Sequence, residues 1–401
     1  MNPLLNLAFD IPFDQIRAEH VRPAVEELLE KAKESVEAIA GQTGTPTYAS
    51  TLDALEAATE PLERAMTVVG HLESVVSTPE LRDAYNAVIP EVSAFFASLP
   101  LNEGLWKVLN RLAQTEEAKS LSTTKKRFLE KTLDDFRRHG AELSPAGKER
   151  LQAITRELAE LTSRFAQNVL DATAAFELVI EDESRLAGLP AAAKEAAREA
   201  AKAKGLPGYR FTLHAPSYIP LMTYLDDAGL REKVWRAYDT RASFGAHDNR
   251  ALVRRILELR KEKAHLLGFA DFSDLVLADR MAENGDRASE FVHRLRQRTE
   301  PYFEKENEAL EKFRAESGDD QPMQPWDLAY WSEKQRRALF DFDEEALRPY
   351  FPLDRVMEGM FDIVSRLYGI RVEEKQGIPV WHPTVRVFDS EAGDGTLLCR
   401  F

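Results

Sequence analysis

The chain has 401 residues, of which 44% are apolar and 30% charged, an ordinary balance for a globular protein with a sizeable interior. At this length we expect two sub-domains or one elongated helical body rather than a single compact core. The 68 acidic and 53 basic side chains give a formal net charge of -15, which opposes binding to a phosphate backbone and argues against a nucleic-acid-binding protein.

Amphipathic helices dominate the predicted structure. Thr78-Pro79 and Ser144-Pro145 each place a capping hydroxyl before a proline at the first helical position, and Gly268 is suited to end a helix. Apolar residues recur at steps of three and four behind these signals. Helices are predicted over 20–40, 52–76, 80–98, 122–138, 144–169, 191–204, 249–267, 287–317 and 353–368, and 325–331 opens a further helical pattern.

Strand signals are few. Alternating apolar residues over 176–180 and 209–213 predict two short strands that could pair across the intervening alanine-rich helix. Val385 and Val387 begin another alternation, and the turn-forming residues 389–395 follow it. Residues 397–401 would then return as the second arm of a hairpin.

These elements predict a mainly α fold with a few short strands. The helical pattern gives way to the first strand near 172–176, so we place the domain boundary there. The prediction is an N-terminal helical region, 1–174, followed by a mixed helical region with short strands, 175–401. Residues 318–322 are expected to form a loop inside a domain.

The histidines bear on whether the chain binds a metal. A helical zinc site needs two imidazoles one turn apart, so that both nitrogens face the same ion. No two histidines here are closer than 18 positions, and a site would require distant residues to converge. The eight histidines are His20, His71, His139, His214, His247, His265, His293 and His382. We expect His20 and His265 on helices, and His214 and His382 in loops beside prolines.

Other chemical motifs have simpler structural interpretations. Cys399 has no histidine nearby in sequence and is predicted to be a strand residue rather than a nucleophile. Residues 341–345 resemble a calcium loop only faintly and better fit the acidic start of a helix. Residues 205–208 form a turn without a phosphate-binding lysine, and 125–127 a solvated basic helix face. The aromatic cluster of Trp326, Tyr330 and Trp331 is expected to pack in a core rather than to bind peptides.

Cysteine content and the N-terminal sequence bear on location. The lone Cys399 excludes an internal disulfide and fits a reducing compartment. Residues 1–7 lack a basic region followed by a long apolar run, so they do not form a signal peptide. No window approaches the roughly 18 uninterrupted apolar residues of a membrane span. We therefore expect a cytoplasmic protein that binds neither membranes nor nucleic acids.

Many short segments spread along essentially the whole chain are informative when taken together. They are Glu19–Ala24, Asn168–Thr173, Tyr238–Ser243, Ala264–Phe269, Pro325–Trp331, Leu347–Leu353 and Val380–Phe388. Their order gives the chain a resemblance to the oligopeptidase A and thimet oligopeptidase family of zinc metallopeptidases. It implies a mostly helical, prolate fold in two lobes with a channel that admits short peptides. It also implies a zinc ion that activates a water held by a glutamate.

The His-Glu-x-x-His motif that binds zinc in this family occurs nowhere in the 401 residues. We therefore predict no catalytic, cofactor-binding or metal-binding residue in this chain. The predicted function is that of the N-terminal portion of a zinc oligopeptidase, truncated inside the catalytic lobe and inactive alone. The alternative is a non-enzymatic helical module that binds peptides or proteins. Apolar side chains including Phe351, Met357, Phe361 and Leu367 are expected to be partly uncovered and to favour self-association.

Overall fold

The computed structural model describes residues 2–76, 78–340, 347 and 349–401. Its contacts divide the chain into two compact units, one formed by Met1–Lys148 with Pro349–Phe401 and the other by Glu149–Arg348. The chain thus leaves the first unit near residue 148 and returns to it at residue 349.

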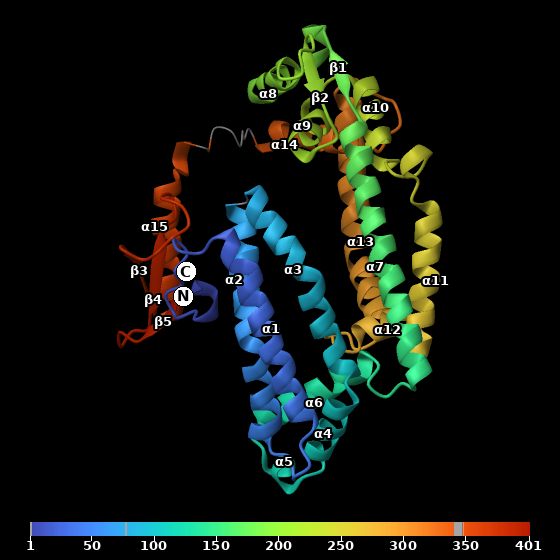
Figure 1. Ribbon diagram of the computed structural model, residues 1–401. Coiled ribbons are helices and arrows are strands. Elements are labelled where there is room, and N and C mark those ends of the chain that lie inside the picture. Colours follow the sequence, from blue (N-terminus) through green and yellow to red (C-terminus); the bar gives the residue numbers. More distant parts are fainter. Residues whose placement is uncertain (1, 77, 341–346, 348) are drawn as a thin grey trace. The chain divides into compact units, whose positions relative to one another are not determined.

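The first unit contains a helical bundle and a small sheet covered by one further helix (Figure 1). Short 3-10 turns lie at Pro3–Leu5 and Leu99–Leu101, and a π turn at Ala49–Asp53. The helices are α1 (Ala18–Ala40), α2 (Ala54–Val75), α3 (Pro79–Ser98), α4 (Glu103–Ala113), α5 (Glu116–Ser120), α6 (Thr123–Arg138) and α15 (Leu353–Tyr368). The strands are β3 (Arg371–Lys375), β4 (Val387–Glu391) and β5 (Leu397–Arg400).

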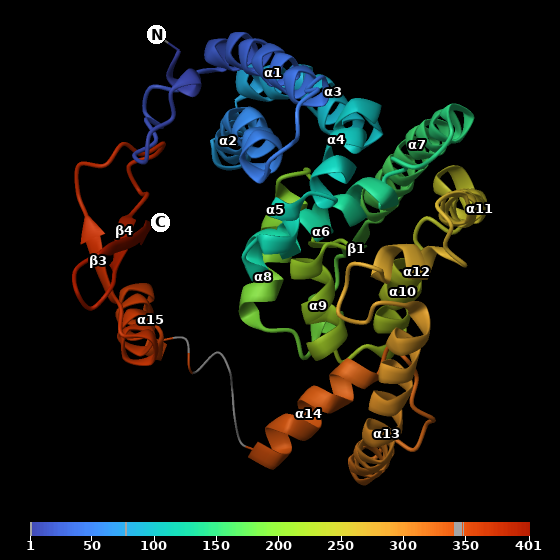
Figure 2. The same cartoon turned by 90° about the horizontal axis from the view of Figure 1, so that it is seen from below.

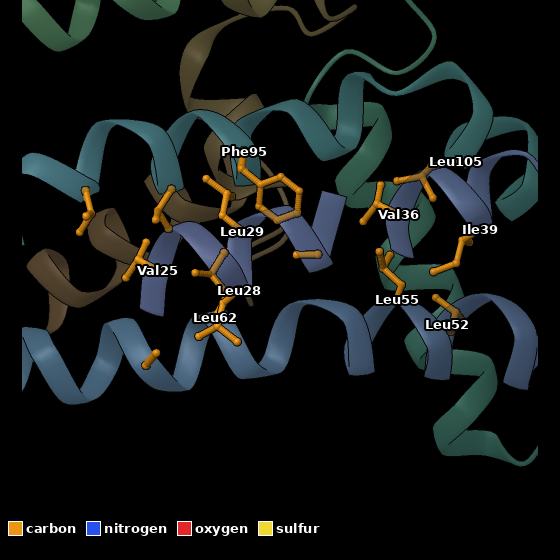
Figure 3. Close-up of a cluster of buried hydrophobic side chains, with 14 of the residues drawn as sticks. Val25, Leu28, Leu29, Val36, Ile39, Leu52, Leu55, Leu62, Phe95 and Leu105 are labelled. Atoms are coloured by element: carbon orange, nitrogen blue, oxygen red, sulfur yellow. The ribbon is translucent and has the colours of Figure 1, made fainter. Parts of the chain in front are cut away.

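Helix α1 forms the centre of the bundle core. Its apolar residues recur every three or four positions, so that Val25, Leu29 and Val36 all turn inward, with α2 and α3 on either side (Figure 3). Leu62 of α2 is fully buried beside them, and Phe95 of α3 is 6% exposed. Burial of each such side chain contributes roughly 1.5–3 kcal/mol, which makes this cluster the main stabilising element of the unit.

The C-terminal part of the first unit is an antiparallel sheet in the order β3-β4-β5, with α15 alongside it (Figures 1 and 2). Phe361 of α15 contacts Phe388 at a ring separation of 5.0 Å and Phe401 at 6.4 Å. The predicted hairpin is confirmed, but its turn is shorter than expected because Asp389 belongs to β4. The Asp389 carboxylate is buried against Arg400 of β5 at 2.6 Å, and this pairing overrides the turn preference of the local sequence.

The second unit is built around long helices and one two-stranded sheet. The helices are α7 (Pro145–Ala175), α8 (Ala191–Lys202), α9 (Ala215–Tyr224), α10 (Ala228–Asp239), α11 (Arg250–Leu266), α12 (Phe272–Leu277), α13 (Gly285–Glu316) and α14 (Leu328–Phe340). The 3-10 turns lie at Glu183–Leu186 and Gly245–His247. Strands β1 (Leu178–Ile180) and β2 (Tyr209–Phe211) pair antiparallel on either side of α8 in the chain, as the sequence predicts.

Helices α7 and α11 run side by side (Figures 1 and 2). Arg255 of α11 makes two hydrogen bonds to the Glu157 carboxylate of α7, at 2.6 and 3.0 Å. Asn249, which precedes α11 and is buried, accepts a hydrogen bond from the side-chain amide of Asn168 at 2.8 Å. These polar contacts set the alignment of the two helices.

The mainly α fold with few short strands is confirmed, and so are the N-caps at Thr78 and Ser144, whose hydroxyls accept backbone N–H bonds. Helices α4, α5, α9, α10 and α12 and strand β3 were not predicted. The division at 174/175 coincides with the end of α7 rather than with the limits of the two compact units, and it stays a prediction about sequence regions. Within the described residues, no helix is long and apolar enough to cross a bilayer.

Candidate functional site

The histidines make separate local contacts. His20 accepts the backbone N–H of Arg17 at the start of α1, and His139 lies 3.3 Å from Asp135 one turn earlier in the chain. His265 contacts the carbonyl of Ala270. His214 directly precedes α9, and His382 contacts Thr384 in a loop. His247 lies in a 3-10 turn and His293 is exposed on α13.

A catalytic zinc takes three protein ligands and keeps one open position. Among the residues that the structure describes, no three His, Cys, Asp or Glu side chains come together in a way that could hold a metal ion. The described residues therefore do not fit the zinc that the resemblance implies, and no step of its chemistry is assigned to them.

The remaining candidate motifs have structural roles. Cys399 is exposed on β5, and 125–127 lie on the exposed face of α6. The turn at 205–208 connects α8 to β2, and Gly208 adopts φ +72 with its Cα so close to the Ile180 carbonyl that a Cβ would lie 2.3 Å from it. The faint calcium-loop sequence at 341–345 lies outside the described residues.

The aromatic cluster at the start of α14 was predicted to pack in a core, and two of its three members do so. Tyr330 and Trp331 are 6% and 7% exposed, and their rings meet edge to face at 5.4 Å. Trp326 lies in the turn before the helix and is half-buried, where it contacts Trp235 of α10. The cluster is thus a packing element, and Trp326 differs from the predicted stripe because α14 begins only at Leu328.

A buried ion pair between α10 and the turn before α14 organises this core. The Arg231 guanidinium, 2% exposed, donates to the Asp327 carboxylate at 2.6 Å. It also donates to the carbonyls of Leu225 at 2.6 Å, Asp226 at 3.1 Å and Trp326 at 3.1 Å. Arg231 therefore bonds three backbone carbonyls besides the Asp327 carboxylate, and it links α10 to the turn that begins α14.

A second arginine extends the network to α13. Arg314, 5% exposed, lies 3.6 Å from Asp327 and donates to Asp319 at 3.0 Å. Burial by itself would raise the pKa of Asp319, but the Gln321 N–H and the Arg314 guanidinium together hold that pKa below its ordinary value. Two arginines thus face two aspartates where α10, α13 and the turn before α14 meet.

Tyr330 connects the network to Asp226. Its hydroxyl donates to the Asp226 carboxylate at 2.6 Å, and the Arg231 guanidinium lies over its ring at 4.0 Å from the centroid. Burial, and then the hydrogen bond to the Asp226 carboxylate, raise the pKa of Tyr330. The side chain is a neutral donor over the whole physiological pH range.

Residues 380–388, one of the segments that carry the family resemblance, lie in the first unit and are held by aromatic contacts. Trp381 meets the ring of His71 on α2 at 4.4 Å and that of Phe13 at 4.9 Å. A cavity of about 400 Å³ lies beside them, lined largely by apolar side chains and by Arg400. The Nε2 atom of His71 is buried and has no hydrogen-bond partner among the described residues. The motif is thus anchored to the helical bundle through apolar contacts.

No sequence pattern indicated the Arg231 network. Arg231 within α10 and Asp327 96 positions later carry no local pattern. The one sequence feature close to the network is the aromatic cluster, in which Asp327, the buried partner of Arg231, lies between Trp326 and Tyr330. The partners are brought together only by the packing of α10, α13 and α14.

Comparison with known proteins shows the family. Residues 25–149 match the N-terminal domain of neurolysin and thimet oligopeptidase, and residues 221–397 match peptidase family M3. The first match ends at the limit of the N-terminal stretch of the first compact unit, Lys148.

Individual relatives agree. The chain is 40% identical over 393 residues to oligopeptidase A of Haemophilus influenzae and 40% identical over 395 residues to oligopeptidase A of Escherichia coli, in each case over 97% of this chain and 58% of the relative. It is 33% identical to the dipeptidyl carboxypeptidase of Escherichia coli over 100% of this chain and 60% of the relative. The chain therefore spans under two thirds of the length of these relatives. Because the two family matches follow one another in order and the similarity to oligopeptidase A runs along nearly all of it, the chain belongs to peptidase family M3, of which it contains the N-terminal domain and part of the peptidase domain.

Proposed function

We propose that these residues form the N-terminal part of a zinc-dependent oligopeptidase that cleaves short peptides. The observation that carries the proposal is the 40% identity to oligopeptidase A along 97% of the chain. The dipeptidyl carboxypeptidase relative, whose name also denotes action on peptides, supports the same substrate class.

In this proposal the 401 residues and the rest of the enzyme have different roles. These 401 residues contain no His-Glu-x-x-His, and the described ones offer no group of three metal-binding side chains. Their proposed contribution is a rigid helical framework that orients peptides, with α14 fixed by the Arg231–Asp327 pair. Zinc binding and the activation of water would be supplied by the part of the M3 domain that has no counterpart in this chain.

The test measures zinc content and peptide cleavage in the purified chain. We expect no stoichiometric zinc by mass spectrometry and no chelator-sensitive cleavage of a quenched fluorescent peptide of roughly ten residues, because a catalytic zinc site needs three ligands. A fusion that continues this chain with the unmatched part of the Haemophilus influenzae relative should bind zinc and cleave the peptide.

Three outcomes would contradict parts of the proposal. Stoichiometric zinc and chelator-sensitive turnover in the 401-residue chain would overturn the division of work. A folded, zinc-loaded fusion that neither binds nor cleaves peptides would overturn the oligopeptidase function itself. Peptide binding without cleavage by the folded, zinc-loaded fusion would favour the non-enzymatic binding module.

Two further predictions accompany this function. The lone exposed Cys399 supports a reducing location such as the cytoplasm. The net charge of -15 supports peptides rather than nucleic acids as ligands. Fractionation of cells and a nucleic-acid binding assay would test these two predictions separately.

A further inference from the structure

Helix α15 has a wider apolar surface than the sheet beside it covers. At about 100° per residue, its apolar side chains span roughly half of the helix circumference. Met357, Phe361 and Val364 on one side of this arc are half-buried, and Phe361 packs on Phe388 and Phe401 of the sheet. No residue of α15 is fully buried. The other side of the arc is open.

The open side is a continuous stripe at positions i, i+3, i+7, i+10 and i+14. The five residues, called the α15 stripe below, are Leu353 (74% exposed), Val356 (43%), Met360 (44%), Ile363 (58%) and Leu367 (69%). Two of the residues predicted to be uncovered, Leu367 of the stripe and Phe351 just before α15, are exposed, Phe351 by 63%. A 3-4-3-4 spacing of apolar residues is the pattern by which one helix packs against another.

Gly359 produces a hollow in the middle of this surface. A Cβ placed on it would meet nothing within 4 Å. The hollow has a volume of about 470 Å³. It is lined by Val356, Met360 and other side chains of α15, and by Tyr350 and Phe351 just before the helix. A glycine inside an exposed helix costs stability relative to alanine, so its presence here has no explanation within the helix itself.

We propose that the α15 stripe and the Gly359 hollow form the docking surface for an amphipathic helix from the remaining part of the M3 peptidase domain. The inference rests on the proposed function. The aligned region covers 58% of the Haemophilus influenzae relative, so roughly two fifths of that protein has no counterpart here and is available to cover this surface. A large apolar side chain of the docking helix would enter the Gly359 hollow.

The geometry favours this occupant over a second copy of the chain. Gly359 lies at the centre of the 16-residue helix α15. Two α15 helices packed antiparallel about that centre would therefore place hollow against hollow, and neither would receive an inserted side chain. An extended peptide fits the surface less well, because its side chains alternate with a period of two rather than following steps of three and four.

The test uses two leucine substitutions at neighbouring positions of α15. Gly359→Leu fills the hollow, whereas Glu358→Leu adds the same side chain on the charged face between Asp354 and Asp362. Both replacements are compatible with a helix. The 401-residue chain is co-expressed with the unmatched part of the Haemophilus influenzae relative, and association is measured by sedimentation velocity and titration. In parallel, hydrogen exchange of α15 is measured in the free chain and in the fusion of the two parts.

We expect a one-to-one complex and slower hydrogen exchange of α15 in the fusion than in the free chain. Gly359→Leu should weaken association by about tenfold or more and restore fast exchange, because overfilling a packed contact strains it. Glu358→Leu should leave both unchanged. Circular dichroism should show equal helix content in both variants.

The proposal is overturned if Gly359→Leu binds as tightly as the unchanged chain, or if neither the separate parts nor the fusion covers α15. A homodimer of the 401-residue chain that Gly359→Leu disrupts would assign the surface to a second copy instead. Association is measured without zinc or peptide. A complex that assembles but cleaves nothing would therefore contradict the proposed function and leave this docking surface intact.

Discussion

The turn leading into α14 and the layer of α15 with strands β3 to β5 are held in place by different forces. In the first, the buried Arg231–Asp327 pair at 2.6 Å and three hydrogen bonds to backbone carbonyls close a core around Tyr330 and Trp331. In the second, aromatic contacts such as those of Trp381 and Phe361 accompany the Asp389–Arg400 ion pair within the sheet, and one side of α15 stays open.

This difference predicts different responses to substitution. A buried charge is tolerated only while its partners are in place, so removing one partner leaves the other desolvated and unpaired. Aromatic contacts are less directional, and neighbouring apolar groups can partly fill the space when one is lost. We therefore expect the core at α14 to be sensitive to single polar substitutions, and substitutions of the aromatic side chains beside α15 and the sheet to reduce stability in smaller steps.

The largest effect is expected for Asp327→Asn. The substitution keeps the size of the side chain but leaves Arg231 and Arg314 with one fewer carboxylate, and we expect it to destabilise the second unit by about 3 kcal/mol. Urea unfolding followed by tryptophan fluorescence gives the free energy, and hydrogen exchange locates the loss. Asp320→Asn, at an exposed position in the preceding loop, is the control and should change stability little. Equal stability of both variants would contradict the role assigned to the buried pair.

Trp381→Ala should come next, with a loss of about 2 kcal/mol in the first unit. It removes the ring contacts with Phe13 and His71, but Trp381 is only half-buried, which limits the cost. Trp381→Phe keeps an aromatic ring and should cost less than half as much. Thermal unfolding of both variants checks this order, and a larger loss than in Asp327→Asn would reverse the comparison of the two regions.

Tyr330→Phe should cost about 1 kcal/mol, since it removes the hydrogen bond to Asp226 at 2.6 Å and keeps the ring. The substitution should also change the pH dependence. The folded state raises the pKa of Tyr330, so above pH ~10 the unfolded chain loses a proton that the folded chain retains, and stability falls as the pH rises. Unfolding measured at intervals from pH 8 to 11 should show a shallower decline in the variant. An unchanged slope would mean that this hydroxyl titrates normally.

The smallest effect has the opposite sign. Gly359→Ala should stabilise α15 by roughly 0.5–1 kcal/mol, because alanine restricts the unfolded chain and its methyl group meets nothing within 4 Å. Hydrogen exchange of the α15 amides should slow accordingly in the free chain. Faster exchange would show that the backbone at Gly359 adopts a conformation that alanine disfavours.

Local sequence patterns predicted much of the fold. Strands β1 and β2 were located and correctly paired across α8, because alternation of apolar residues reports a half-buried strand directly. The helix start at Pro79 was identified by its capping hydroxyl on Thr78, a contact made within three residues. Helix α9 was missed because its proline residues interrupt the periodic signal.

The order of segments along the sequence by itself determined the family, since many short matches in one order need no three-dimensional information. Only the tertiary structure decided which residues stabilise the second unit. Arg231 and Asp327 are separated by 96 positions, and nothing local distinguishes them from solvated charges. Likewise the helical pattern of 353–368 showed that α15 is amphipathic, but only packing on the sheet revealed which part of its apolar arc stays open. Local patterns reflect the conformation of a few neighbouring residues, whereas burial and ion pairing depend on contacts between distant ones.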